Sequence, residues 1–325
     1  MTMYIQVIAG FIILVGGAEF LVRGAVNLAD RLGIPPIVVG MTVVAIGTSA
    51  PELVVSLKAT VAGSPGLALG NLVGSNIANV LLILGATCAL KPIVDHPGST
   101  AMDGYVLMGG SIIFVGLCLM GELSLFAGIV LLIAFFGFLG ATYWRDTHDP
   151  EAAADLVEEV EDLRGDPKPL PISFGFVVAG FVGLIYGADL LVQGGTEIAR
   201  AFGVSEEVIG LTLFALGTSL PELAASLVAA FRGHPAVAIG NVVGSNLFNI
   251  LGVGGVIASV ATIPVADQIS RFDIWIMLAS TAVLLPVLLW GWRVTRLFGG
   301  LLLVAYTGYV WIQAAGVEKV LASIG

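Results

Sequence analysis

The chain has 325 residues, of which 58% are hydrophobic and only 11% are charged, whereas soluble domains carry about 25% charged residues. Its formal net charge of −10 is concentrated in nine acidic residues between positions 146 and 166, and no basic patch indicates a nucleic-acid partner. This composition excludes an ordinary soluble domain and predicts a polytopic protein of the lipid bilayer.

Apolar runs of helical length predict ten membrane-spanning helices, and we therefore expect an all-α fold. The first five expected spans cover residues 4–29, 34–61, 66–90, 101–120 and 123–144. A polar, acidic linker follows. The other five expected spans cover residues 171–199, 204–231, 236–260, 271–292 and 297–316.

Two blocks of the sequence occur twice, each at an offset of 170 residues. GTSAPELVVSL at 47–57 matches GTSLPELAASL at 217–227, and GNLVGSNIAN at 70–79 matches GNVVGSNLFN at 240–249. The repeat also includes residues 10–33 and 180–203, so the unit is about five spans long. Because five is odd, the second unit must enter the membrane from the opposite side, as in many secondary transporters. We therefore expect an inverted repeat at 1–145, a linker at 146–170 and a second repeat at 171–325.

The distribution of lysine and arginine predicts the orientation of these spans. With ten spans, nine of these residues fall on the side that holds the linker and four on the side that holds both termini. The positive-inside rule then places the acidic linker in the cytoplasm and both termini outside an inner (plasma) membrane.

The duplicated GTSxPE block concentrates oxygen atoms at a helix break. Pro51 lacks an N–H group, and its ring clashes with the carbonyl one turn earlier, near Gly47. We expect the second span to break there and to leave carbonyl oxygens that a bilayer tolerates only inside protein or a cavity. Thr48 and Ser49 add hydroxyls, and Glu52 adds a carboxylate. The second copy repeats all of these residues: Gly217, Thr218, Ser219, Pro221 and Glu222.

The GNxxGSNxxN block predicts the helix that faces this break. Asn71, Gly74, Ser75 and Asn79 share one helical face, and the glycines permit close approach between membrane helices. The second copy supplies Asn241, Gly244, Ser245 and Asn249. Interhelical packing alone remains an alternative role for the glycines and for Asn71 and Asn241.

Together the two copies predict a binding site for hard cations. They supply two carboxylates, hydroxyls, amide oxygens and carbonyls, which suit Ca²⁺ with its six to eight oxygen ligands. Zinc and copper are disfavoured, because the motifs contain neither histidine nor cysteine. An ionisable residue within a membrane span indicates a functional site, and two adjacent glutamates need protons or Na⁺ to balance their charge when Ca²⁺ is absent.

A second equivalent acidic pair, Glu19 and Asp189, has a structural interpretation. Arg23 lies four residues after Glu19, which favours an ion pair on one helix face. Gln193 occupies the corresponding position after Asp189 and can only form a hydrogen bond with it.

At these residues the chain resembles the cation/calcium exchanger superfamily, specifically the prokaryotic sodium/calcium exchangers. The paired GTSxPE and GNxxGSNxxN blocks are similar to the two alpha repeats of that family, and the resemblance covers essentially the whole chain. It implies a Na⁺/Ca²⁺ antiporter that works by alternating access, with the transported ions as substrates and no cofactor. The linker is too short for the regulatory calcium-binding domains of animal exchangers.

The resemblance also implies roles for individual residues. Glu52 and Glu222 would be the central ligands shared by Ca²⁺ and Na⁺. The flanking Na⁺ positions would be lined by Thr48, Thr218, Ser75, Ser245 and the carbonyls of Ala45 and Ala215. The site would be completed by Ser49, Ser219, Asn79 and Asn249. Several relatives, notably the potassium-dependent branch, have aspartate where Asn249 stands, so we expect exchange that needs no K⁺. We also expect electrogenic exchange, because the oxygen supply of the motifs is large enough for more than two Na⁺.

Three alternatives are weighed against this interpretation. The same two glutamates could exchange H⁺ for Ca²⁺. An intramembrane serine hydrolase would need a base near Ser49 or Ser219, but His96, His148 and His234 all fall in expected loops, so we do not expect an enzyme. A channel is disfavoured, because inverted repeats with paired helix breaks are typical of alternating access.

Overall fold

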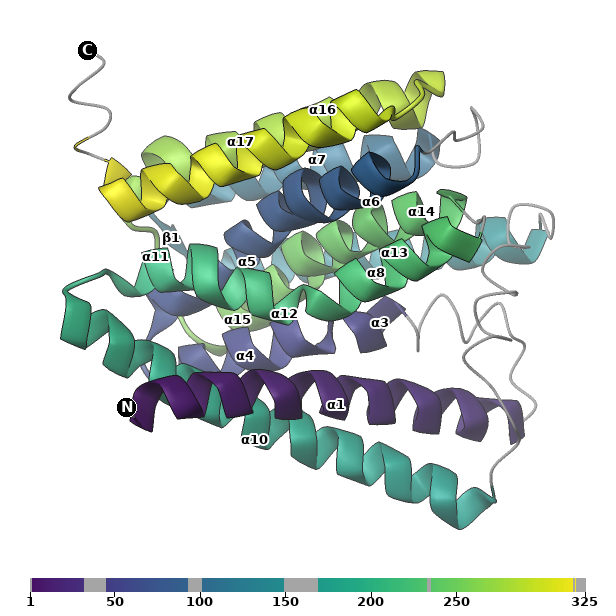
Figure 1. The fold of residues 1–325 in the computed structure, drawn as a ribbon, viewed down its shortest axis with the longest axis horizontal. Coiled ribbons are helices and arrows are strands. Elements are labelled where there is room, and N and C mark those ends of the chain that lie inside the picture. Colours follow the sequence, from purple (N-terminus) through teal and green to yellow (C-terminus); the bar gives the residue numbers. More distant parts are fainter. Residues whose placement is uncertain are drawn as a thin grey trace.

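The computed structural model describes residues 2–31, 45–92, 101–148, 169–232, 235–317 and 319, and this part of the chain is mostly helical. Helices α1 (Thr2–Arg31) and α10 (Leu170–Phe202) lie side by side along one edge of the molecule (Figure 1). They run antiparallel, since Gly10 of α1 meets Gly187 of α10, whereas Gly24 meets Ser173.

A seam of small residues holds α1 and α10 together. Its glycines recur every seven residues, which places them on one face of each helix: Gly10, Gly17, Gly24, Gly180, Gly187 and Gly194. A Cβ atom on Gly17 would lie 2.7 Å from the backbone nitrogen of Leu184, and one on Gly187 would lie 2.7 Å from that of Leu14. Close backbone approach through small residues is a common way for membrane helices to associate.

Two broken helices lie next to this pair. The first consists of α3 (Ala45–Thr48) and α4 (Ala50–Val61). The second consists of α11 (Glu206–Ile209), a π-helical turn η3 (Gly210–Phe214), α12 (Ala215–Thr218) and α13 (Leu220–Arg232). The second helix bends by 40° between α12 and α13.

Two further helices form the most buried part of the molecule. One consists of α5 (Pro65–Ala78), the π-helical turn η2 (Asn79–Leu84) and α6 (Gly85–Leu90). The other consists of α14 (Pro235–Leu247), the π-helical turn η4 (Phe248–Val253) and α15 (Gly254–Val260). Both carry the GNxxGSNxxN block, which therefore lies in the interior.

The remaining described helices pack around this interior, most of them on the side away from α1 and α10 (Figure 1). They are α7 (Ala101–Cys118), α8 (Leu125–His148), α16 (Ile274–Trp290), which follows the π-helical turn η5 (Ile269–Asp273), and α17 (Arg296–Ala315). Two short strands, β1 (Glu122–Leu123) and β2 (Ile263–Pro264), pair antiparallel. The all-α expectation omitted this small sheet, because two-residue strands give no periodic signal.

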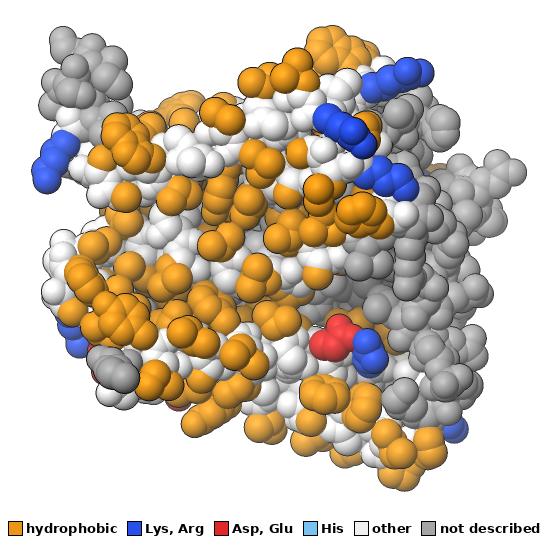
Figure 2. All heavy atoms as spheres, in the orientation of Figure 1, with side chains coloured by type: hydrophobic (Ala, Val, Ile, Leu, Met, Phe, Trp, Pro, Cys, Tyr) orange, Lys and Arg blue, Asp and Glu red, His pale blue; other side chains and the backbone are white. Residues whose placement is uncertain are grey.

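Seven helices in the described ranges are long and apolar enough to cross a membrane, and the bent pair α11–α13 is an eighth candidate. Met102–Cys118 is a shorter apolar helix, and residues 34–44 of the expected second span lie outside the described residues. Hydrophobic side chains dominate the visible face over α1, α10, α13 and α17 (Figure 2). Helix α8 ends at His148, beyond the expected residue 144, and residues 149–168 of the expected linker are outside the described ranges.

Candidate cation-binding site

The two helix breaks have nearly the same backbone geometry. The break in the first repeat is at Ser49, with φ −90° and ψ 9°, and the break in the second is at Ser219, with φ −83° and ψ 7°. Pro51 and Pro221 lie in the first turn of the helix that follows, where the missing N–H costs nothing. The predicted break around 47–51 therefore occurs at Ser49.

Glu52 and Glu222 lie in the first turns of α4 and α13, and both side chains are fully buried. Ser49 donates a hydrogen bond to Oε1 of Glu222 over 3.0 Å, and Ser219 donates one to Oε1 of Glu52 over 3.2 Å. The second oxygen, Oε2, of each glutamate is buried without a partner in the described structure. Each carboxylate is thus positioned by the other repeat and has one oxygen left for a ligand.

The hydroxyls of Thr218 and Ser75 meet beside these glutamates. Thr218 Oγ1 lies 3.4 Å from Ser75 Oγ and 3.2 Å from Oδ1 of Asn71. It also lies 3.0 Å from the carbonyl of Phe214, one turn earlier in its own helix. Thr48, the counterpart of Thr218, is only partly buried. Ser75 of the first repeat and Thr218 of the second repeat therefore lie next to each other.

On the other side of the site, Ser245 lies 3.1 Å from Ser49, Oγ to Oγ, so Ser49 contacts both Ser245 and Glu222. Ala45 and Ala215 begin the short helices α3 and α12 that lead to the breaks. The carbonyl of Ala215 accepts the N–H of Ser219 at 3.2 Å. Only its second lone pair is therefore available to an ion.

Asn79 is the first residue of the π-helical turn η2, and Asn249 lies within the π-helical turn η4. Both side chains are fully buried. Asn79 Nδ2 donates to Oδ1 of Asn246 over 3.0 Å, which leaves Asn79 Oδ1 unpartnered. Both side-chain atoms of Asn249 lack partners within the described residues. The π-helical turns coincide with these amides, and such turns are frequent at functional sites.

Sequence reasoning missed Asn76 and Asn246, although both copies of the block contain them. Both are fully buried. Asn246 Nδ2 donates to the carbonyl of Asn76 over 3.4 Å, and Asn76 Nδ2 donates to the carbonyl of Leu72 over 2.8 Å. Their presence at the same place in both blocks was the signal that could have identified them.

Asn71 and Asn241 connect each buried helix to its neighbour. Asn71 Nδ2 donates to Ser56 Oγ over 3.0 Å, and Asn241 Nδ2 donates to Ser226 Oγ over the same distance. Asn241 also donates to the backbone carbonyl of Glu222 over 3.1 Å. These contacts support the packing role that was left open for this pair, while Asn71 additionally reaches Thr218 through its oxygen.

In the second acidic pair, Glu19 and Asp189, only Glu19 forms an ion pair that the sequence predicted. Glu19 forms the expected ion pair with Arg23. Asp189 forms an ion pair with Lys58 Nζ at 3.3 Å, a contact that the sequence reasoning did not anticipate. Lys58 is on α4, and a contact between different helices cannot be read from spacing along one of them.

A further buried carboxylate, Asp273, also escaped sequence reasoning. It is fully buried and accepts hydrogen bonds from Tyr309 over 3.0 Å, from Gln268 over 3.3 Å and from Gln313. Tyr309 and Gln313 belong to α17, so these hydrogen bonds connect α17 to the π-helical turn η5, which precedes α16. Both of its carboxylate oxygens accept hydrogen bonds, and we interpret the cluster as structural.

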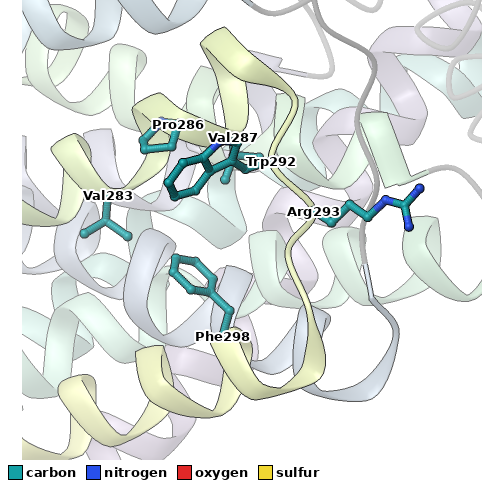
Figure 3. A pocket seen from close by; sticks show the side chains of 6 residues that line it. All are labelled: Val283, Pro286, Val287, Trp292, Arg293 and Phe298. Atoms are coloured by element: carbon teal, nitrogen blue, oxygen red, sulfur yellow. The ribbon is translucent and has the colours of Figure 1, made fainter.

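Two surface pockets among the described residues lie away from the duplicated blocks. One apolar pocket between α16 and α17 is shown in Figure 3, where Arg293 points away from the side chains around it. Its lining consists of Val283, Pro286, Val287, Trp292, Arg293 and Phe298. None of these belongs to the duplicated blocks, so this pocket is separate from the candidate site.

The interior cluster suits hard cations. Four of its buried oxygens have no partner in the described residues: Oε2 of Glu52, Oε2 of Glu222, Oδ1 of Asn79 and Oδ1 of Asn249. A buried polar atom without a partner is costly, and two ionised carboxylates that share one buried site repel each other. A cation with oxygen preference would satisfy both demands.

Comparisons with known proteins agree on one family. The family described as "Sodium/calcium exchanger protein" matches residues 2–144 and 172–315. CaxA of Alkalimonas amylolytica, whose name proposes an antiporter, is 38% identical over 95% of this chain and 97% of its own length. Sodium/calcium exchanger MaX1 of Methanosarcina acetivorans is 30% identical over 94% of this chain and 97% of its own.

A solved structure has the same fold. The sodium-calcium exchanger NCX_Mj, soaked with 2.5 mM Na⁺ and 0.1 mM Ca²⁺, superposes with a TM-score of 0.63 at 30% sequence identity. The match covers 94% of this chain and 97% of that one.

Proposed function

The chain belongs to the sodium/calcium exchanger protein family, and from this premise we propose that it exchanges Na⁺ for Ca²⁺ across a membrane. The observation that carries the proposal is the set of buried, unpartnered oxygens on Glu52, Glu222, Asn79 and Asn249. Two carboxylates balance one Ca²⁺ or two Na⁺, so the same cluster can serve both ions in turn. The family membership makes an enzymatic role for the duplicated serines unnecessary.

The proposed ion ligands come from both repeats. Glu52 and Glu222 are the central ligands, because each retains a free oxygen in a fully buried environment. Hydroxyls, amides and two backbone carbonyls complete the set, which consists of Thr48, Thr218, Ser49, Ser219, Ser75, Ser245, Asn79, Asn249, Ala45 and Ala215. Neutral oxygens around two charges are the donors that Na⁺ and Ca²⁺ share.

We further propose ten spans in two inverted halves, at residues 1–145 and 171–325, joined by a cytoplasmic linker at 146–170. The antiparallel packing of α1 on α10 supports this arrangement, because these helices occupy corresponding places in the two repeats. Both termini then lie outside the cytoplasm, as the lysine and arginine distribution predicts. Alternating access follows from two similar halves that flank one shared site.

The test is a flux measurement with purified protein in lipid vesicles. An outward Na⁺ gradient, with the pH clamped equal on both sides, should drive uptake of radioactive Ca²⁺. Vesicles with equal Na⁺ on both sides, and vesicles without protein, are the controls. Absence of Na⁺-driven uptake by folded protein would contradict the proposal.

Exchange of H⁺ for Ca²⁺ is the second candidate. It is favoured by one observation: within the described ranges no basic side chain forms an ion pair with Glu52 or Glu222. Two such carboxylates can be neutralised by protons as well as by Na⁺. A pH gradient that drives Ca²⁺ uptake in Na⁺-free vesicles, where a Na⁺ gradient at clamped pH does not, would establish this alternative.

A further inference from the structure

The amides of Asn79 and Asn249 occupy corresponding positions in the two repeats but have different surroundings. Asn79 Nδ2 donates to Asn246 Oδ1 over 3.0 Å. The repeat would place the same bond between Asn249 and Asn76, yet both side-chain atoms of Asn249, and Oδ1 of Asn76, lack partners in the described structure. The pseudo-symmetry is therefore broken at this point.

The asymmetry originates in Asn76 and Asn246. Asn76 directs its NH₂ group to the carbonyl of Leu72 in its own helix, over 2.8 Å. Asn246 instead uses both ends of its amide across the repeat boundary, because Oδ1 accepts from Asn79 and Nδ2 donates to the carbonyl of Asn76 over 3.4 Å. One asparagine is bound to its own helix, and its counterpart joins α14 to the other half.

This contact determines which end of the Asn79 amide can meet a cation. A carboxamide has one oxygen that ligates a cation and one NH₂ group that cannot. Since the NH₂ group of Asn79 is held by Asn246, its oxygen is the free end, and that oxygen is buried without a partner. The reversed amide would place NH₂ in the position where a ligand oxygen is needed.

We propose that Asn246 is a positioning residue that turns the Asn79 oxygen toward the ion, whereas the Asn249 amide is oriented only when an ion binds. The inference deepens the proposed function and rests on its ion site. The two amide ligands then differ: the orientation of the Asn79 amide is fixed before the ion binds, and that of the Asn249 amide is not. Preorganising a ligand raises affinity by removing the cost of ordering it on binding.

The repeat supplies a matched control. Asn76 and Asn246 are the same residue at corresponding positions, and both are fully buried. Equilibrium binding of radioactive Ca²⁺ to detergent-solubilised, full-length protein should therefore be compared for Asn246→Ala and Asn76→Ala. Loss of a hydrogen bond that orients a ligand should weaken binding about tenfold in Asn246→Ala, against less than about threefold in Asn76→Ala. Equal losses would overturn the proposal.

A double-mutant cycle separates positioning from a merely structural role. If Asn246 acts through Asn79, Asn79→Ala and the double variant with Asn246→Ala should bind Ca²⁺ equally, because coupled residues are not additive. The effects of Asn249→Ala and Asn246→Ala should add. In an Asn79→Asp background, where both carboxylate oxygens can ligate, Asn246→Ala should cost less than about threefold. An additive effect with Asn79 would overturn the proposal.

Two measurements keep the outcome interpretable. Thermal unfolding without Ca²⁺ shows which variants fold. If Asn246→Ala does not fold, Asn246→Asp carries the test, because it keeps an acceptor for Asn79 and must bind Ca²⁺ at least as tightly as the unmodified protein. Weaker binding would overturn the inference. Failure of the unmodified protein to bind Ca²⁺ would instead contradict the proposed function itself.

Discussion

Ser49 of the first repeat donates a hydrogen bond to Glu222 of the second over 3.0 Å, and its counterpart Ser219 donates one to Glu52 over 3.2 Å. Each repeat therefore supplies the serine that positions the other repeat's carboxylate. Neither glutamate receives this hydrogen bond from the serine of its own repeat. The exchange of partners explains why the serine and the glutamate are duplicated together, three residues apart, on either side of a proline.

The first prediction concerns these serines. Ser49→Ala and Ser219→Ala each remove a donor to a buried carboxylate, and hydrogen bonds to charged groups contribute about 1.5–3 kcal/mol. We expect each variant to lower Ca²⁺ affinity about tenfold or more. Titration of Na⁺-driven flux against Ca²⁺ concentration gives the measurement. Ser124→Ala, outside the duplicated blocks, is the control, and unchanged affinity in both site variants would contradict the proposed geometry.

The second prediction concerns the carboxylates. Glu52→Gln or Glu222→Gln should abolish Ca²⁺ transport, since removal of one negative charge leaves a divalent ion uncompensated in a region of low dielectric constant. Uptake of radioactive Ca²⁺ into vesicles measures the effect, with the amount of folded protein checked by gel filtration. Glu19→Gln is the matched control, because Glu19 is exposed and paired with Arg23. Near-normal flux in either site variant would exclude that glutamate as a ligand.

Much of this site could be predicted from the sequence because it was encoded twice. Glu52 and Glu222 are ionisable groups in apolar runs, and Pro51 and Pro221 locate the breaks within a few residues. Ser49 illustrates the limit of this reasoning. Its residue type was identified, but the fact that it bonds to Glu222 rather than to Glu52 depends on how the two halves meet.

Other features depend on tertiary contacts that leave no periodic signal. The partner of Asp189 is Lys58 on another helix, and Asn246 reaches Asn79 across the repeat boundary. The π-helical turns that contain Asn79 and Asn249 were likewise not apparent from the sequence pattern. For the same reason, the pairing of β1 with β2 could not be anticipated from four residues.

The third prediction concerns the seam between α1 and α10. In Gly17→Ala the added Cβ would lie 2.7 Å from the backbone nitrogen of Leu184, so the two helices must separate. Overpacking typically costs about 1–3 kcal/mol, and we expect a lower unfolding temperature in detergent. Gly16→Ala is the neighbouring control, since its Cβ would meet no described atom within 4 Å. Equal unfolding temperatures for the two variants would contradict the assigned packing.

The fourth prediction concerns electrical balance. Two Na⁺ would neutralise Glu52 and Glu222, but the neutral oxygens of the proposed ligand set suffice for more than two ions. We expect more than two Na⁺ per Ca²⁺, so an inside-negative potential should favour Ca²⁺ extrusion. One net charge moved across the membrane is worth about 2.3 kcal/mol per 100 mV. Ca²⁺ flux that is indifferent to a potential imposed with K⁺ and valinomycin would exclude electrogenic exchange.

The fifth prediction concerns the neutral amide of Asn249. With asparagine at both 79 and 249, the site has two carboxylates and a formal charge of −2. Because Ca²⁺ alone neutralises these two carboxylates, the Ca²⁺-loaded site needs no K⁺ to balance its charge. We therefore expect Na⁺-driven Ca²⁺ flux to persist when choline replaces K⁺ on both sides of the vesicle.

The variant Asn249→Asp provides the comparison for this prediction. A third carboxylate would offset the additional positive charge, so K⁺ should stimulate Ca²⁺ flux in Asn249→Asp more than in the unmodified protein. Asn241→Asp, in the same block but bonded to Ser226, is the matched control for added charge. Loss of flux in the unmodified protein without K⁺ would show that K⁺ is required and that charge balance at Asn249 does not determine ion selection.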